Sequence, residues 1–188
     1  MRLEEATHIL ISVLTVSMAF TIVWTQSLAT APETFLVVLL TVGVGFILHE
    51  LAHKYVALHY KAWAEYRAWT LGLALAVVLA LTLGVVFAAP GAVFIYGPHL
   101  NRKQNGHIAI AGAATNFALA VVFAALAFSV PGLRETCLLG AKVNLFLGWF
   151  NTVPIFPLDG QKVWAWSKPI WAITFIVLSL ALFFFPLG

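Results

Sequence analysis

The sequence predicts an all-α, polytopic membrane protein with about six membrane segments and a short re-entrant, strand-like region. Hydrophobic residues make up 62% of its 188 residues and charged residues only 9%, whereas a soluble domain carries about 25% charged residues. Apolar runs of about 20 residues, the length that crosses a bilayer, alternate with short polar or proline-containing breaks. This composition leaves too little polar surface for a water-soluble enzyme, a nucleic-acid-binding domain or a disordered chain.

Five apolar runs predict helical spans: His8–Gln26, Phe35–Leu58, His107–Val130, Glu135–Phe150 and Trp164–Phe185. At about 20 residues per span plus loops, the length allows about six spans and leaves no room for an additional soluble module. We therefore expect a single integral-membrane domain over residues 1–188, with a core over about residues 35–160. A short amphipathic stretch, Gln161–Lys168, is predicted at the entry to the last span.

A sixth apolar run, Thr70–Ala89, is followed by a Pro90-Gly91 break and by Ala92–Tyr96. The residues AVFIY are β-branched or aromatic and favour a strand. Suppose that this region enters the membrane as a helix and returns as a strand. Then eight of the ten basic residues face one compartment, and only Arg134 and Lys142 lie towards the other. The positive-inside rule assigns the compartment with the basic residues to the cytosol. A single crossing would reduce that bias. We therefore expect a re-entrant hairpin whose strand borders a wet cavity, because lipid cannot satisfy an extended backbone.

A metal-binding motif lies in the second predicted span, where His49-Glu50-Leu51-Ala52-His53 fits H-E-x-x-H. On a helix, residues four apart lie on the same face, one turn above the other. Two imidazoles so placed can hold one zinc ion, and the intervening carboxylate lies near the metal-bound water. Ionisable side chains inside an apolar span are costly and mark a functional site. The motif therefore predicts that His49 and His53 bind zinc.

A catalytic zinc ion usually has three protein ligands, and the residues alone leave four candidates for the third. His59 lies where the metzincin pattern places its third histidine, but Val56 occupies the position of the glycine that turns the chain back. Glu65 lies in a polar connector near Arg67, where a solvated ion pair is the alternative role. His107 opens a predicted span and is expected at the membrane interface.

The fourth candidate is Asp159, the only aspartate in the chain. It lies in the segment NTVPIFPLDG, residues 151–160, in which two prolines forbid a regular helix and Gly160 permits a sharp turn. Such a backbone can present a carboxylate sideways into a cavity at membrane depth. The alternative is that Asp159 caps the N-terminus of the helix predicted over Gln161–Lys168.

Together, HELAH at residues 49–53 and NTVPIFPLDG at residues 151–160 resemble the site-2 protease family of intramembrane zinc metalloproteases. The second segment is similar to the family's N-x-x-P…L-D-G signature, and Gly112-Ala113-Ala114-Thr115-Asn116 is similar to its G-x-x-x-N helix. The resemblance covers about Phe35–Gly160, and it indicates a compact form without PDZ or CBS modules. The Thr70–Ala89 run looks like an insertion before the family's membrane-embedded strand region.

The resemblance implies roles for six residues. The zinc ligands would be His49, His53 and Asp159, and the catalytic glutamate would be Glu50. Asn151 would hold the substrate carbonyl or its oxyanion, and Asn116 would help to position the substrate. The implied reaction is zinc-assisted hydrolysis of peptide bonds within or near the transmembrane segments of membrane-protein substrates. The small residues at 112–114 have an alternative role in close helix packing.

The expected partners are transmembrane protein substrates and the lipid bilayer, with no nucleic acid. The expected location is the cell membrane, with several crossings and the site towards the cytosol; no oligomeric state is predicted. A substrate helix must unwind because its carbonyls are hydrogen-bonded, and Ala92–Tyr96 is expected to pair with the unwound segment by strand addition. Two alternatives remain: a prenyl-protein type of membrane zinc peptidase that uses His59 or Glu65, and a small transporter or channel lined by polar residues.

Overall fold

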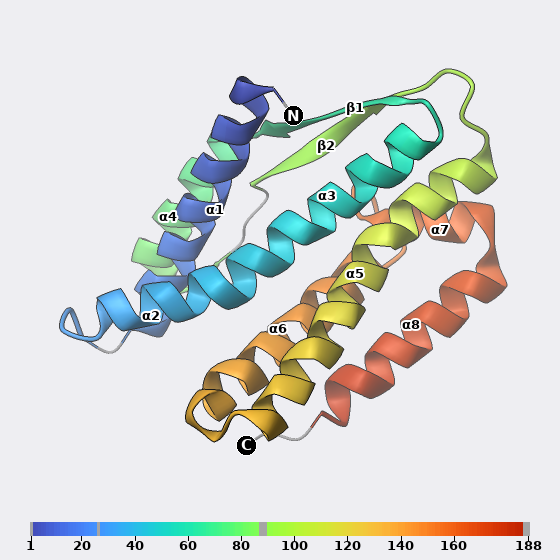
Figure 1. Cartoon of the computed structure of the whole chain (residues 1–188). Helices are drawn as coiled ribbons and strands as arrows, with labels where there is room; N and C mark the ends of the chain where they lie inside the picture. The colour runs from blue at the N-terminus through green and yellow to red at the C-terminus, as the bar shows by residue number, and fades with distance from the viewer. Residues whose placement is uncertain (1, 26, 87–89, 186–188) are drawn as a thin grey trace.

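The computed structural model describes residues 2–25, 27–86 and 90–185, and it is mostly helical (Figure 1). In chain order, its elements are α1 (Leu3–Trp24), α2 (Ala31–Val38), the π-helical turn η1 (Leu39–Gly43), α3 (Val44–His59), β1 (Trp63–Ala68), α4 (Thr70–Leu83), β2 (Gly91–Tyr96), α5 (Arg102–Ser129), the 3₁₀ turn η2 (Pro131–Leu133), α6 (Arg134–Asn151), α7 (Asp159–Trp166) and α8 (Lys168–Phe183). The helical class is confirmed. The predicted strand is present as β2, although it belongs to a two-stranded sheet with β1.

Among the residues that the structure describes, three helical stretches are long and apolar enough to cross a membrane: α1, the continuous α2–η1–α3 stretch over Ala31–His59, and α5. They agree with three of the predicted spans to within a few residues, and they are compatible with membrane association. Helices α4 and α8 are apolar but shorter, with 14 and 16 residues. The total of about six membrane segments therefore stays a prediction. The predicted ends at Gln26 and Ala89 lie outside the described residues.

The last predicted span begins later in the structure than in the prediction. Helix α7 ends at Trp166 and α8 begins at Lys168, because the extended backbone of Ser167 separates them. The Ser167 hydroxyl accepts a hydrogen bond from the Ile170 N–H at 3.5 Å, and Pro169 lies in the first turn. Both features favour the start of a helix. The beginning of the predicted span is therefore part of the short helix α7.

The two strands show that the chain between them returns to its starting point. They pair antiparallel, with Ala68 opposite Gly91, and the Trp69 N–H donates to the Pro90 carbonyl at 3.1 Å just beyond that pair. The chain that leaves β1 through α4 thus comes back to the same place to begin β2, which is the return that a re-entrant hairpin requires. The part of the polar connector that contains Glu65 and Arg67 is strand β1 in the structure.

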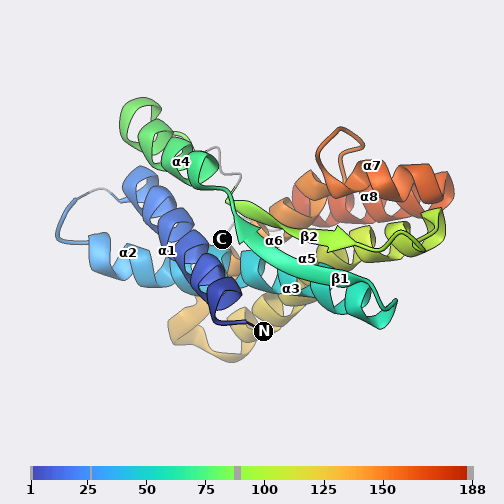
Figure 2. The same cartoon turned by 90° about the horizontal axis from the view of Figure 1, so that it is seen from above.

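Helices α3 and α5 lie side by side, α6 packs against both α5 and η1, α8 lies beyond α5, and the α1–α4 pair lies on the other side of α3 (Figure 1). Figure 2 shows the two strands between the α1–α4 pair and the α5–α8 half of the molecule. The face of α5 that contacts its neighbours carries Gly112 and Ala113, both buried, whereas Ala114 is exposed. Small residues on this face let the neighbouring helices approach closely.

Buried polar groups attach the N-terminal helix to α3 and to the outer edge of β1. Glu5, only 2% exposed, forms an ion pair with Lys54 of α3 and accepts a hydrogen bond from the Tyr66 N–H at 3.0 Å. The Nδ1 atom of His8 accepts a hydrogen bond from the Ala68 N–H at 3.2 Å. Side chains of α1 therefore occupy the outer edge of β1.

Candidate functional site

The structure brings together the two histidines of H-E-x-x-H and the single aspartate. His49 and His53 lie one turn apart on α3, and Asp159 is the first residue of α7. The two Nε2 atoms are 3.0 Å apart, and Oδ2 of Asp159 lies 3.4 Å from His49 and 2.8 Å from His53. Within residues 2–25, 27–86 and 90–185, these side chains form the one group of three whose ligand atoms all lie within 4.8 Å of one another.

Hydrogen bonds on the far side of both imidazole rings leave the Nε2 atoms available to a metal ion. Nδ1 of His49 lies 2.6 Å from Oδ1 of Asn116, and Nδ1 of His53 lies 2.7 Å from the Ile108 carbonyl oxygen. Because both partners are acceptors, each ring carries its proton on Nδ1 and turns an unprotonated Nε2 towards the group. Metal-binding histidines are commonly oriented in this way. Two imidazoles and one carboxylate form a donor set that suits zinc.

Two glycines make room for this group. A Cβ atom on Gly112 of α5 would lie 2.5 Å from both Cε1 and Nε2 of His49 and 2.7 Å from Cε1 of His53. A Cβ atom on Gly160, the residue after the aspartate, would collide with the backbone of Thr152. Helix α5 and the loop before α7 can therefore close around the three side chains only because both positions lack a Cβ. This close packing fits a group of side chains that surrounds an ion.

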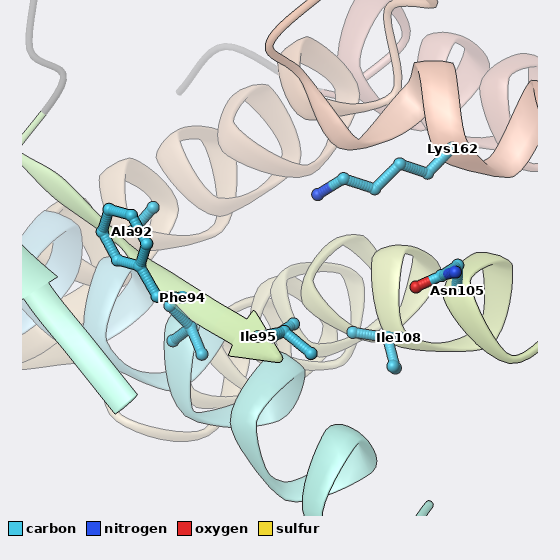
Figure 3. A pocket seen from close by; sticks show the side chains of 7 residues that line it. Ala92, Phe94, Ile95, Asn105, Ile108 and Lys162 are labelled. Carbon is cyan, nitrogen blue, oxygen red and sulfur yellow. The ribbon is translucent and has the colours of Figure 1, made fainter. Parts of the chain in front are cut away.

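The three side chains line a cavity of about 740 Å³, one wall of which is strand β2. The lining also includes the other predicted site residues, Glu50, Asn116 and Asn151. A smaller pocket of about 300 Å³ extends along β2 between α5 and α7, and Lys162 reaches over it from α7 (Figure 3). The candidate ligands, the predicted base and the strand therefore share one hollow.

Glu50 links the H-E-x-x-H helix to strand β2, because its Oε2 accepts a hydrogen bond from the Val93 N–H at 3.0 Å. Tyr66 and Ala68 turn their N–H groups away from β2, towards α1. Their partners in the register, Val93 and Gly91, must then turn their own backbone groups away from β1. The outer edge of β2 therefore faces the cavity, beside Glu50.

The aspartate meets the imidazoles through one of its two oxygens. Oδ2 of Asp159 points at the two rings, while Oδ1 accepts a hydrogen bond from the Lys162 ammonium group at 3.2 Å. A carboxylate held in this way can bind an ion with one oxygen atom. Two histidines and one such carboxylate leave the fourth position of a tetrahedral zinc site open for water.

The two predicted asparagines lie in different surroundings. Asn151 ends α6 at the cavity wall, and its Nδ2 donates to the Leu147 carbonyl of its own helix at 2.9 Å. Asn116 is completely buried, and its side chain contacts the imidazole of His49. The catalytic role of Asn151 and the substrate-positioning role of Asn116 stay predictions. The position of Asn116 places its Oδ1 atom against the imidazole of a candidate ligand.

The other candidates for the third ligand lie outside the group. His59 is the last residue of α3, and its ring packs against Tyr60 with the ring centroids 5.3 Å apart. Glu65 forms the predicted ion pair, with 2.6 Å to Arg67, but it is 3% exposed and so is buried rather than solvated. Nδ1 of His107 lies 2.5 Å from the Tyr60 hydroxyl. The geometry thus favours the aspartate and gives no support to a prenyl-protein type of site.

A helical fold with membrane-length apolar helices and a two-histidine, one-carboxylate group that could hold a metal ion is compatible with a membrane-associated metalloprotein, and comparison with known proteins gives the family. The chain is 50% identical over 142 residues to "Putative zinc metalloprotease MJ0611" of Methanocaldococcus jannaschii, with 74% of each chain covered. It is 35% identical over 125 residues to "Putative zinc metalloprotease Rip3" of Mycobacterium tuberculosis, a match that covers 63% of this chain and 28% of that protein. The chain therefore belongs to this zinc metalloprotease family, which is consistent with the resemblance to site-2 proteases. No family model and no solved structure matches the chain.

Proposed function

We propose that this protein is an intramembrane zinc metalloprotease that hydrolyses peptide bonds within or near the transmembrane segments of membrane-protein substrates. The observation that supports this most strongly is the single cavity that contains His49, His53, Asp159, Glu50 and the outer edge of β2. A metal site for hydrolysis and an edge that can bind extended peptide lie together there. The apolar helices around the cavity make a membrane-embedded peptide the matching substrate.

The proposal includes a multi-pass location in the cell membrane, with the site towards the cytosol and one domain whose core spans about residues 35–160. The two strands, the end of α3 and the start of α5 lie at one end of the molecule, and the α5–α6 turn lies at the other (Figure 1). The elements at the first end contain Arg67 and Arg102, whereas Arg134 begins α6 at the opposite end. The positive-inside rule favours the first end as the cytosolic one.

In the proposed reaction, a zinc ion held by the two histidines and the aspartate would supply a Lewis acid that activates water and polarises the scissile carbonyl. Glu50, one residue from His49 on the same helix, would accept a proton from the attacking water and deliver it to the leaving amine. Asn151 would turn its amide from the Leu147 carbonyl to the oxyanion of the substrate. A hydrogen bond of this kind is worth about 3 kcal/mol in the transition state.

The outer edge of β2 is the proposed binding surface for the unwound substrate segment. The backbone groups of Gly91 and Val93 point towards the cavity, and the period of two in a strand gives Ile95 the same direction. The corresponding edge of β1 is already filled by Glu5 and His8, whereas on β2 a peptide carbonyl would take the place of the Glu50 carboxylate at the Val93 N–H. A peptide can therefore add a strand on one side of this sheet only, and that side passes the candidate zinc ligands.

Glu50→Gln tests the proposed function, because it removes the base but keeps an oxygen that can accept the Val93 N–H. We expect the variant to retain zinc and to cleave a transmembrane reporter substrate about 10²- to 10⁴-fold more slowly than the parent. Glu33→Gln, on the exposed start of α2, is the matched control and should cleave normally. Full activity of Glu50→Gln would contradict the proposed base. A parent protein that binds no zinc and cleaves no peptide would favour the transporter or channel alternative.

A further inference from the structure

A line of buried hydrogen bonds runs behind the metal group through three helices. Nδ2 of Asn144, on α6, donates to the carbonyls of Gly140 at 2.9 Å and of Thr41 at 3.5 Å. Oδ1 of Asn144 accepts from Nδ2 of Asn116 on α5 at 2.9 Å, and Oδ1 of Asn116 lies 2.6 Å from Nδ1 of His49 on α3. Both asparagines are 0% exposed. Two fully buried amides thus connect backbone carbonyls to a candidate zinc ligand.

The carbonyls at the far end determine the direction of every hydrogen bond in this line. A carbonyl oxygen can only accept, so Asn144 must turn its NH₂ group towards the two carbonyls and its oxygen towards Asn116. Asn116 must then turn its own NH₂ group towards Asn144 and, at 3.2 Å, towards the Gly45 carbonyl. Its oxygen is left facing His49. That imidazole must therefore carry its proton on Nδ1, which keeps Nε2 free.

The packing of the helices is adapted to this line. The Thr41 carbonyl belongs to the π-helical turn η1, and such turns inside α-helices often occur at functional sites. A Cβ atom on Gly45 would collide with the amide of Asn144, and one on Gly148 would lie 3.3 Å from Cβ of Asn116. Polar side chains inside apolar helices are costly, so the close fit around two of them indicates a specific role.

We infer that Asn144 and Asn116 act as a relay that fixes the tautomer and orientation of His49 for metal binding. Asn144 is then a positioning residue, two hydrogen bonds away from the ligand. Asn116 orients His49 directly. The relay rests on the proposed zinc site.

Two substitutions of Asn144 separate this role from simple packing. Asn144→Leu fills the space in an apolar bundle but removes the nearer of the two acceptors that hold the NH₂ group of Asn116, leaving only the Gly45 carbonyl at 3.2 Å. With the amide of Asn116 less firmly held, we expect zinc affinity to fall by about 10- to 100-fold. Asn144→Asp, kept protonated by its apolar surroundings, retains one acceptor and one donor, so affinity stays near that of the parent. A packing role predicts the opposite order, because a carboxyl group is costlier to bury than leucine.

Zinc affinity is measured by chelator competition in detergent, and the tautomer of His49 is measured by ¹⁵N NMR of its ring nitrogens in the metal-free protein. The parent should show one form with the proton on Nδ1, and Asn144→Leu should show a mixture. Thr21→Val removes a buried hydroxyl of α1 that donates to the Ser17 carbonyl, and this control should change neither measurement.

The relay is wrong if Asn144→Leu binds zinc as tightly as the parent and keeps a single tautomer. If Asn144→Leu does not fold, Asn144→Ala serves in its place, since it also removes the amide. If the parent binds no zinc, the proposed function fails, and the tautomer measurement still decides the relay.

Discussion

Gly112→Ala is the substitution that most severely tests the geometry of the metal group. Gly112 lies on α5, against the imidazole rings of both H-E-x-x-H histidines. The added methyl group changes no charge and no hydrogen bond. In an exposed helix, alanine would be favoured over glycine by about 1 kcal/mol. Any loss of metal binding must therefore come from a collision with the rings.

The size of the collision follows from the structure. The new Cβ atom would lie 2.5 Å from two atoms of the His49 ring and 2.7 Å from one atom of the His53 ring, whereas carbon atoms in contact lie about 3.5–4.0 Å apart. The His49 ring or helix α5 must move by about 1 Å. Metal–ligand distances are held to within about 0.2 Å, so a shift of this size removes His49 as a ligand.

We therefore expect Gly112→Ala to weaken zinc binding by more than about 100-fold, the upper end for the loss of a group behind a ligand. Chelator competition in detergent measures the affinity, and thermal unfolding of the metal-free protein measures the cost of overpacking, about 1–3 kcal/mol. Gly132→Ala is the matched control, because a Cβ atom there meets nothing within 4 Å. A Gly112→Ala variant with the zinc affinity of the parent would refute the described arrangement of the rings.

Three further predictions concern stability, substrate binding and the metal. Lys54→Met leaves Glu5 buried without its partner and should lower the free energy of unfolding by about 3–5 kcal/mol in thermal melts. Arg134→Met, at an exposed ion pair, should lower it by less than about 1 kcal/mol. Equal effects of the two substitutions would contradict the buried ion pair. Val93→Pro removes an N–H group that faces the cavity but leaves the hydrogen bonds between β1 and β2 intact. It should therefore stop cleavage without changing zinc binding. Normal cleavage by this variant would contradict strand addition. A chelator should abolish cleavage and added zinc should restore it, and cleavage that persists without metal would exclude the proposed chemistry.

Local sequence patterns predict the elements that carry the chemistry, but they do not predict how those elements pair. The H-E-x-x-H spacing places His49 and His53 on one helical face whatever surrounds the helix, and AVFIY forms β2 as its β-branched and aromatic residues predict. Its partner β1 is predicted only as a polar connector, because Glu65 and Arg67 interrupt any apolar alternation. The pairing also depends on the return of the chain after α4, which only the three-dimensional packing determines.

The residues of the candidate site are likewise predicted only in part from the sequence. The residues alone leave four choices for the third ligand, and only the resemblance selects Asp159. The distance from Asp159 to the histidines cannot be read from the sequence, because it depends on how α7 packs against α5. Asn144 belongs to no motif. The signal that could have identified it is an asparagine in the middle of the apolar run Glu135–Phe150, since a polar side chain inside a span marks a function. Its contact with Asn116 requires the packing of α5 against α6.

The zinc content of the purified protein in detergent, compared between the parent and Asp159→Ala, tests the central claim most directly. The claim is that a carboxylate near the end of the chain completes a metal site begun by two imidazoles on α3. We expect about one zinc ion per parent chain and its loss in Asp159→Ala, with Glu33→Ala as the control that keeps the ion. Asp159→Ala with a full equivalent of zinc at the affinity of the parent would contradict this account and would indicate His59 or Glu65 as the third ligand.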